Sequence, residues 1–270
     1  MIPEVILFDL DDTLMVEKAS AEAAFIEVCK YARNKYDINP EKFHESVRKN
    51  ARKLWYELPA HPYCKKIGIS SWEGLWANFA GNHEMLKLLA SYKSFYQFTS
   101  WYNSLKEFKI NDKGFAGILS EMFRRERRKR HLLYPETIEV LDNLVSEFQL
   151  GLITNGTPDL QWEKINGGNL KKYFKHIIIS GEVNFGKPDK QIFNIALNKF
   201  KVNKESVIMI GDSIDRDIEG AKASGIKAIW LNRNNSTQKE LTTQPDYIIK
   251  NLRELIPLFD NKDYFKQEQS

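Results

Sequence analysis

Six short apolar runs, most of them separated by amphipathic stretches, set the pattern of this chain. They are residues 5–8, 150–153, 177–179, 207–210, 228–231 and 247–249. Between them apolar positions recur at helical spacing, as from Ile138 to Phe148, where Pro135 is placed to open a helix. Short continuous apolar runs indicate strands covered on both faces, and their alternation with helices is typical of a parallel sheet. We therefore expect an α/β fold built on a Rossmann-like, doubly wound parallel sheet.

Residues 17–131 interrupt this pattern. They contain no convincing strand, and their helical stretches are separated by polar breaks at Asn39-Pro40, at 59–62 and at 111–114. They hold 19 of the 33 Phe, Trp and Tyr residues, enough for a core of their own. A single connection of this length has to be a domain rather than a loop. We expect a catalytic core of residues 1–16 plus 132–270 and a helical cap domain of residues 17–131, inserted after the first strand as a candidate lid.

Composition excludes several classes of protein. With 270 residues, 42% apolar and 28% charged, the chain is an ordinary globular sequence with a net charge of +4. No apolar stretch approaches the roughly 20 residues of a membrane helix. The first strand begins too early to leave room for a secretory signal. Cys29 and Cys64 have neither a disulfide framework nor metal-ligand spacing. We expect a cytoplasmic protein with no membrane partner and an undetermined oligomeric state.

Two features of the insertion have alternative interpretations. The run from Arg124 to Arg130 holds six cations in seven positions. It is either the solvated side of a helix or a surface that attracts anions. A nucleic-acid partner is not expected, because no recognised module or aromatic platform accompanies the run. Trp72 and Trp76, four residues apart on a predicted helix, either pack in the core or face a substrate pocket.

The segment Asp9-Leu10-Asp11-Asp12-Thr13 directly follows the first predicted strand. Unpaired charge at the mouth of a buried strand is costly, so a cation or a reaction is the natural reason for it. A helix N-cap by Asp12 or Thr13 is the alternative, but it explains one acid and not the pair at Asp9 and Asp11.

Two other polar positions follow predicted strands. Thr154 and Asp212 should meet Asp9 at one edge, because the carboxyl ends of parallel strands lie together. Like charges about 4 Å apart repel by about 4 kcal/mol at an effective dielectric near 20, so acids clustered at this edge would need a cation.

Four segments together resemble one family. They are residues 9–13, Thr154-Asn155-Gly156, Lys187 within Gly186-Lys187-Pro188-Asp189, and Gly211-Asp212-Ser213-Ile214-Asp215-Arg216-Asp217. Their order, with a helical insertion between the first and second, resembles the phosphatase branch of the haloacid dehalogenase-like hydrolase superfamily across the whole chain.

The resemblance implies a mechanism. Asp9 would be the nucleophile that forms an aspartyl-phosphate, and Asp11 would protonate the leaving alkoxide and then deprotonate a water. Thr154 and the amides around Asn155 and Gly156 would hold the phosphoryl oxygens. Lys187 would supply a positive charge beside them.

The resemblance also implies a metal site. The Asp9 side chain, the Asp11 backbone carbonyl and the Asp212 side chain would bind Mg²⁺. Asp217 would instead orient a water or Lys187 without binding the ion directly. Asp215, in the same loop, is interpreted as the cap of the following helix.

Asp11 decides the reaction type. The dehalogenases of the superfamily lack an acid at this position, since a halide leaves without a proton, so Asp11 favours an oxygen leaving group. We expect a Mg²⁺-dependent phosphomonoester hydrolase acting on a small soluble phosphorylated metabolite. The alternatives are a phosphosugar mutase with the same aspartyl-phosphate and a non-catalytic phosphate-binding regulatory protein. The intact Asp11, Thr154 and Lys187 disfavour the last of these.

Overall fold

The computed structural model describes residues 3–236 and 243–260. The chain forms two compact units. The first comprises Met1–Val16, Leu133–Asn155 and Ile165–Ser270, and the second comprises Glu17–Leu132 and Gly156–Lys164. Within the described ranges, no helix is both long and apolar enough to cross a bilayer.

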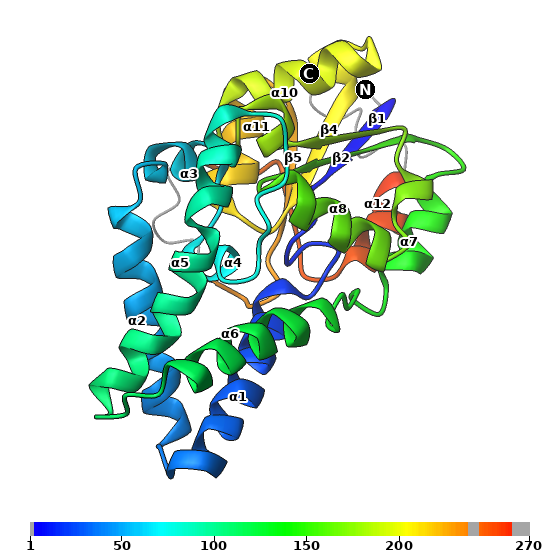
Figure 1. Cartoon of the computed structure of the whole chain (residues 1–270). Helices are drawn as coiled ribbons and strands as arrows, with labels where there is room; N and C mark the ends of the chain where they lie inside the picture. The colour runs from blue at the N-terminus through cyan, green and yellow to red at the C-terminus, as the bar shows by residue number, and fades with distance from the viewer. Residues whose placement is uncertain (1–2, 237–242, 261–270) are drawn as a thin grey trace. The chain divides into compact units, whose positions relative to one another are not determined.

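The first unit is built on a six-stranded sheet in the order β3-β2-β1-β4-β5-β6, in which all neighbouring strands run parallel (Figure 1). The strands are β1 (Val5–Phe8), β2 (Gln149–Thr154), β3 (His176–Ile179), β4 (Val207–Gly211), β5 (Lys227–Leu231) and β6 (Tyr247–Ile249). Each predicted apolar run lies within one of them. The predicted α/β fold with a parallel sheet is confirmed.

Helices cover both faces of this sheet. They are α7 (Thr137–Leu144), α9 (Ser180–Val183), α10 (Lys190–Phe200), α11 (Glu219–Ala223) and α12 (Leu255–Asp260), with the C-terminal part of α8 (Pro158–Gly167), 3₁₀ turns at Lys171–Tyr173, Lys204–Ser206 and Leu252–Glu254, and a π-helix at Ile214–Ile218. In Figure 1, α10 and α11 lie on one side of the sheet and α7 and α12 on the other. Phe193 of α10 packs in one apolar cluster with Leu7 and Met209, which alternate with residues facing the other side.

The helix predicted up to Phe148 is shorter than expected. It begins at Thr137, two residues after Pro135, and ends at Leu144. The apolar spacing continues because the Phe148 N–H donates to the Leu144 carbonyl at 2.9 Å, which adds one irregular turn before β2. Periodicity alone cannot separate such a terminal turn from helix.

The strand order places a crevice at the centre of the sheet. β1 and β4 are neighbours, and the order of strands reverses between them. At such a point the connections leave in opposite directions, which opens a site beyond the carboxyl ends of the two strands. Asp9 follows β1 and Asp212 follows β4, so both lie at this point.

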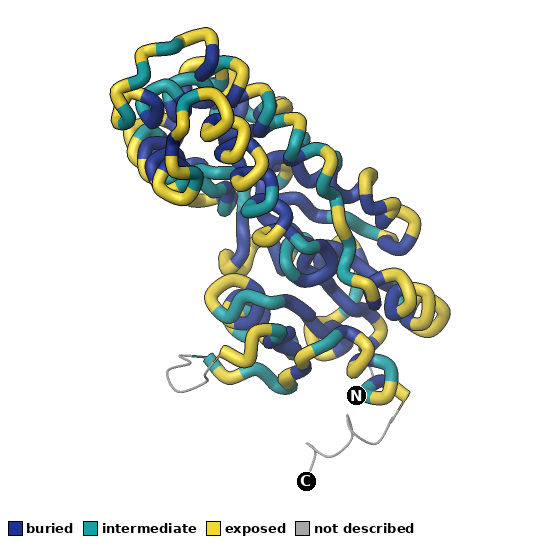
Figure 2. The backbone as a smooth tube through the Cα atoms, turned by 90° about the horizontal axis from the view of Figure 1, so that it is seen from below, coloured by how far each residue is buried: buried dark blue, intermediate teal, exposed yellow. Residues whose placement is uncertain are grey.

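The second unit is a helical bundle. Its helices are α1 (Glu17–Tyr36), α2 (Pro40–Glu57), α3 (His61–Ile67), α4 (Ser71–Gly74), α5 (Glu84–Glu107) and α6 (Lys113–Arg128), with the N-terminal part of α8. α2 packs against α5, α5 against α6, and α1 against both α2 and α6. Two predicted breaks are confirmed, and each supplies the N-cap of the next helix. Asn39 accepts from the Lys42 N–H, and Asp112 accepts from the Phe115 N–H. In Figure 2 buried and exposed residues alternate along these helices, whereas the strands of the sheet are buried along most of their length.

The two tryptophans of the insertion belong to its core. Trp76 is fully buried, and Trp72 packs half-buried against the same aromatic cluster. The prediction that both lie on one helix is wrong, because α4 ends at Gly74. The burial of these two side chains supports the interpretation that they pack in the core.

The basic run is not a solvated face throughout. Arg127 has no exposed surface; its Nη2 donates to Glu17 Oε1 at 2.7 Å, and its guanidinium lies 4.9 Å from the Trp76 ring centroid. Lys164, also fully buried, lies 3.2 Å from Glu17 and 3.5 Å from Glu73. For Arg127 the solvated interpretation is wrong, because internal carboxylates neutralise it inside the helical unit.

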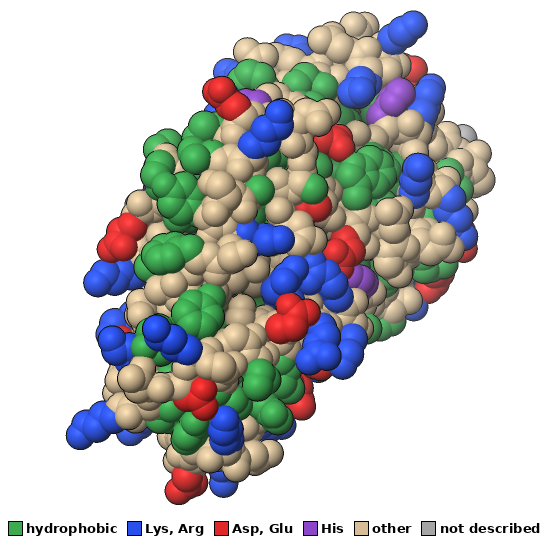
Figure 3. Space-filling view, viewed as in Figure 1, with side chains coloured by type: hydrophobic (Ala, Val, Ile, Leu, Met, Phe, Trp, Pro, Cys, Tyr) green, Lys and Arg blue, Asp and Glu red, His purple; other side chains and the backbone are tan. Residues whose placement is uncertain are grey.

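Other cations of the run pair with carboxylates of the same unit. Lys129 and Arg130 both contact Glu126, and Arg128 contacts Glu163 at 3.2 Å. On the face drawn in Figure 3, Lys and Arg side chains lie among acidic and apolar ones.

Candidate active site

Asp9 is a buried carboxylate whose two oxygens are both held. It follows β1 and continues the ladder, since its N–H donates to the Ile210 carbonyl at 2.9 Å. Its Oδ1 accepts from Lys187 Nζ at 2.5 Å, and its Oδ2 accepts from the Thr13 hydroxyl at 3.1 Å. Burial raises the pKa of Asp9 to about 6; Lys187 opposes that shift, and Asp217 adds to it. The contacts with Lys187 and Thr13 fix the direction of the Asp9 carboxylate.

Lys187 is a buried cation with its donors engaged. Besides Asp9, its Nζ contacts Asp217 Oδ1 at 2.7 Å and donates to the Ile153 carbonyl at 2.7 Å. Burial alone would lower the pKa of Lys187, but the carboxylates of Asp217 and Asp9 raise it above the ordinary value. The structure thus brings Lys187 to the Asp9 carboxylate, as the motif order predicts.

The Asn155 side chain holds the backbone of Lys187. Its Nδ2 donates to the Lys187 carbonyl at 2.9 Å, and its Oδ1 accepts from the Lys187 N–H at 2.8 Å. This reciprocal pair ties the lysine segment to the end of β2. Sequence reasoning assigned only the amides near Asn155 and missed this positioning contact.

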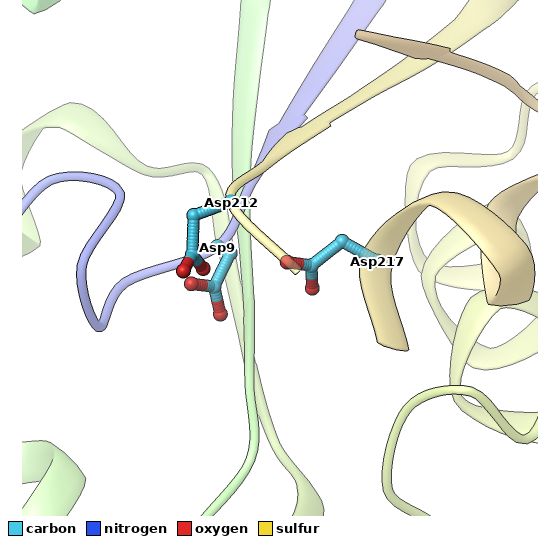
Figure 4. Close-up of side chains that lie close together, drawn as sticks. All are labelled: Asp9, Asp212 and Asp217. Carbon is cyan, nitrogen blue, oxygen red and sulfur yellow. The ribbon is translucent and has the colours of Figure 1, made fainter. Parts of the chain in front are cut away.

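Three carboxylates gather at the crevice. Asp9, Asp212 and Asp217 each offer one oxygen, and these oxygens lie within 4.8 Å of one another. Figure 4 shows Asp9 and Asp212 side by side beyond their strands, with Asp217 reaching toward them from the neighbouring helical turn. Burial, then the charges of Asp9 and Asp217, raise the pKa of Asp212 to about 8.

A divalent cation fits this cluster. Asp212 Oδ1 is buried and has no hydrogen-bond partner, and an unsatisfied buried carboxylate oxygen is costly. The donors are all hard oxygens, the type that Mg²⁺ takes in proteins. The repulsion that raises the pKa of Asp212 would be relieved by positive charge at the same place.

Asp217 is placed by an unusual turn. The π-helix Ile214–Ile218 follows β4 and Asp212, and Asp217 Oδ2 accepts from the Ser213 N–H at 3.0 Å. Gly211 is required beneath it, since a Cβ there would lie 2.3 Å from that same oxygen. Asp215 is exposed within this π-helix, so its prediction as a helix cap is wrong.

The turn after β1 has Thr13 at its centre. The N–H groups of Leu14 and Met15 both donate to the Leu10 carbonyl, and Asp12 has a left-handed φ of 61°. The Thr13 hydroxyl donates to Asp9 and accepts from the Asp212 N–H at 3.1 Å. The first helix begins only at Glu17, so the N-cap interpretation of residues 12 and 13 is wrong.

The remaining predicted site residues are sequence neighbours of Asp9 or Asn155. Asp11 is half-buried in the turn and forms a backbone bridge with Met15. Thr154 is fully buried as the last residue of β2. Gly156, with a φ of 146°, belongs to the second unit.

Two contacts to this centre carry no motif signal. The Trp230 indole N–H donates to the Asp212 carbonyl at 2.9 Å. Arg233 donates to the Thr13 carbonyl at 3.1 Å and pairs with Glu136 at 2.6 Å. These residues lie in segments of ordinary composition, so only the fold brings them here.

The doubly wound parallel sheet thus carries a buried Asp9–Lys187 pair and an acidic cluster beyond the carboxyl ends of β1 and β4. The chain belongs to the haloacid dehalogenase-like hydrolases: that family matches residues 6–231. The predicted resemblance is confirmed, and the protein is a hydrolase of this family, with phosphatases among its relatives.

Curated relatives match over nearly their full lengths. The chain is 34% identical to a phosphoserine phosphatase of Thermus thermophilus over 93% of this chain and 97% of that one. It is 25% identical to the human N-acylneuraminate-9-phosphatase over 96% and 94% of the two chains.

Solved structures share the fold. YfnB of Bacillus subtilis, a putative hydrolase crystallised with magnesium, matches with a TM-score of 0.66 at 22% identity over 96% of this chain and all of that one. A 2-haloacid dehalogenase of Pseudomonas syringae matches with a TM-score of 0.60 at 26% identity over 96% and 98% of the two chains.

Proposed function

We propose that this protein is a Mg²⁺-dependent phosphomonoester hydrolase that works through an aspartyl-phosphate on Asp9. One observation carries the proposal: Asp9 is buried and is held by Lys187 and Thr13 within an acidic cluster. A carboxylate fixed in this way is pre-oriented for attack, which removes part of the entropic barrier of the reaction.

The proposed reaction has two steps. An Asp9 oxygen attacks phosphorus as the bond to the leaving oxygen breaks, and Asp11 gives that oxygen its proton. Asp11 then takes a proton from water, whose oxygen attacks phosphorus and frees inorganic phosphate and Asp9. Thr154, Asn155 and Gly156 would hold the phosphoryl oxygens through hydrogen bonds, and Lys187 would offset their charge.

Asp9, the Asp11 carbonyl and Asp212 are the proposed Mg²⁺ ligands, and Asp217 is proposed to orient Lys187. The contact between Asp217 and Lys187 Nζ supports this division of roles. When bound, the ion neutralises the carboxylates and the phosphate oxygens that face them.

Mg²⁺ is expected to stabilise the protein more at alkaline than at acid pH. The folded-state pKa of Asp212 is raised to about 8, so without metal its contribution to stability is full below pH about 4 and is lost as pH rises through about 8. The ion needs the ionised carboxylate, so its effect grows over the same interval. The measurement is the Mg²⁺-induced shift in thermal midpoint at about pH 6 and about pH 8.5. Asp212→Asn should lose most of the Mg²⁺-induced shift. A wild-type shift at about pH 6 as large as the one at about pH 8.5 would contradict the prediction.

Asp11 favours phosphate esters over haloacids. An alkoxide leaving group needs a proton and a halide does not, so an acid at this position has a use only in the first case. We further propose residues 17–131 as a cap domain and residues 1–16 and 132–270 as the catalytic core. The substrate class is a small phosphorylated metabolite, in keeping with relatives named for phosphoserine and an acylneuraminate phosphate.

The test is phosphate release from a generic aryl phosphate and from a panel that includes phosphoserine, with Mg²⁺ or with a chelator. Release of phosphate and alcohol in equal amounts, only with the metal, is expected. An isomerised sugar phosphate without net release would identify a mutase, and binding without turnover would identify a regulatory protein. Release that is unchanged by chelation would contradict the metal assignment.

A further inference from the structure

We infer that Arg233 is a positioning residue for the nucleophile, acting on Asp9 through Thr13. The inference rests on the proposed function, because it concerns how the Asp9 carboxylate is held for attack. Arg233 lies two residues beyond the end of β5, outside all four motif segments.

The Arg233 guanidinium links two parts of the first unit. Its Nη2 donates to the Thr13 carbonyl at 3.1 Å, and its Nη1 pairs with Glu136 Oε1 at 2.6 Å. Its Cζ atom lies over the Tyr134 ring, 3.6 Å from the ring centroid. The arginine side chain is 15% exposed and that of Glu136 only 3%, so solvent hardly screens the pair.

Thr13 transmits this contact to the reacting group. Its carbonyl is held by Arg233, and its hydroxyl donates to Asp9 Oδ2 while accepting from the Asp212 N–H. A shift of the Thr13 backbone therefore moves one of the two hydrogen bonds that direct the Asp9 carboxylate. The next carbonyl, of Leu14, is anchored separately by the Thr137 hydroxyl at 2.8 Å.

Arginine suits this position because of its planar fork. Two nitrogens point in fixed directions, so one can hold the Thr13 carbonyl while the other holds Glu136, and the flat group stacks on Tyr134. A lysine amine has no such fork and would not hold both partners in one geometry.

The chain contains a matched control in Arg253. It pairs with Glu139 of α7, the helix that Glu136 precedes, at 2.7 Å, but both side chains are about half exposed, at 52% and 53%. The Arg253 guanidinium contacts Glu139, which lies outside the turn after β1. Arg253→Met removes an arginine–glutamate pair of the same chemistry at the surface, without touching the site.

Arg233→Met is expected to lower kcat about 10- to 100-fold with KM within about twofold, because the nucleophile is misdirected while binding groups stay. Arg233→Lys should fall between this variant and the wild type, and Arg253→Met should match the wild type. Arg233→Met leaves the buried Glu136 carboxylate without its partner. We therefore also measure the double variant Arg233→Met/Glu136→Gln, which removes that carboxylate charge as well. Thermal midpoints of all variants are recorded in the same buffer.

A double-mutant cycle with Thr13→Val separates positioning from general damage. If Arg233 acts through the Thr13 hydroxyl, Arg233→Met should cost less than about threefold once that hydroxyl is gone. An equal loss of kcat in both backgrounds, or full kcat in Arg233→Met, overturns the inference while the proposed function stands. A wild type that releases no phosphate overturns the proposed function, and this inference with it.

Discussion

Asp9→Asn is expected to lower kcat for phosphate release by about 10,000-fold or more. Removal of a nucleophile leaves only the binding and electrostatic groups, and a neutral amide does not form the acyl-phosphate. The variant should still fold, because Lys187 keeps its contacts with Asp217 and the Ile153 carbonyl. The measurement is steady-state phosphate release with Mg²⁺, together with the thermal midpoint of each protein.

Asp12→Asn is the control for this substitution. Asp12 lies three residues further along the same turn, is half-buried, and has a left-handed φ of 61° that asparagine also adopts. No chemistry is assigned to it, so its variant should keep activity within a few-fold of the wild type. Equal turnover by Asp9→Asn and the wild type would refute the role of Asp9, whatever the control does.

Lys187→Met is expected to damage both catalysis and stability. Loss of the cation beside the phosphoryl group should reduce kcat by about 100- to 1000-fold. In the folded protein the change leaves Asp9 and Asp217 without their buried partner, and breaking such a pair typically costs about 3–5 kcal/mol. Urea unfolding of the metal-free proteins measures the second effect, and phosphate release measures the first.

The stability loss in Lys187→Met should depend on pH. Lys187 lowers the pKa of Asp9, so its removal moves that pKa further above about 6. A carboxyl with a raised folded pKa loses its contribution to stability as pH rises through that pKa, so the deficit should be larger at pH about 8 than at pH about 5. Lys222→Met is the control, because its partner Asp246 lies 2.7 Å away but the lysine is 35% exposed. A deficit that is independent of pH, or no larger than in the control, would contradict the account.

The sheet could be predicted because its strands are buried on both faces. Such strands must be continuously apolar, and each run therefore marked one strand, from β1 to β6. The motif residues were also predictable as a group, since parallel strands bring their carboxyl ends together at one edge. Asp9 and Asp212 meet there as that rule requires. Lys187 follows no strand directly, and its place beside Asp9 was expected from the family resemblance.

Contacts between distant segments could not be predicted in this way. Arg127 looked like part of a solvated basic run, yet Glu17, 110 residues away in sequence, neutralises it inside the helical unit. Arg233 holds the backbone of Thr13 through one hydrogen bond, and Asn155 holds that of Lys187 through two. Such bonds to backbone atoms impose no periodicity or composition on the chain. The π-helix that carries Asp217 depends on the space above Gly211, which only three-dimensional packing reveals.

The measurement that tests the central claim most directly is chemical trapping of the phosphoryl-enzyme. Wild-type protein is mixed with Mg²⁺ and an active aryl phosphate, quenched within a turnover, reduced with borohydride and mapped by peptide mass spectrometry, beside a sample without substrate. Because borohydride reduces an acyl-phosphate but not a free carboxylate, we predict substrate-dependent conversion of Asp9 to homoserine. Substrate-dependent reduction at another residue, or an unmodified Asp9 in a protein that is turning over, would contradict the account.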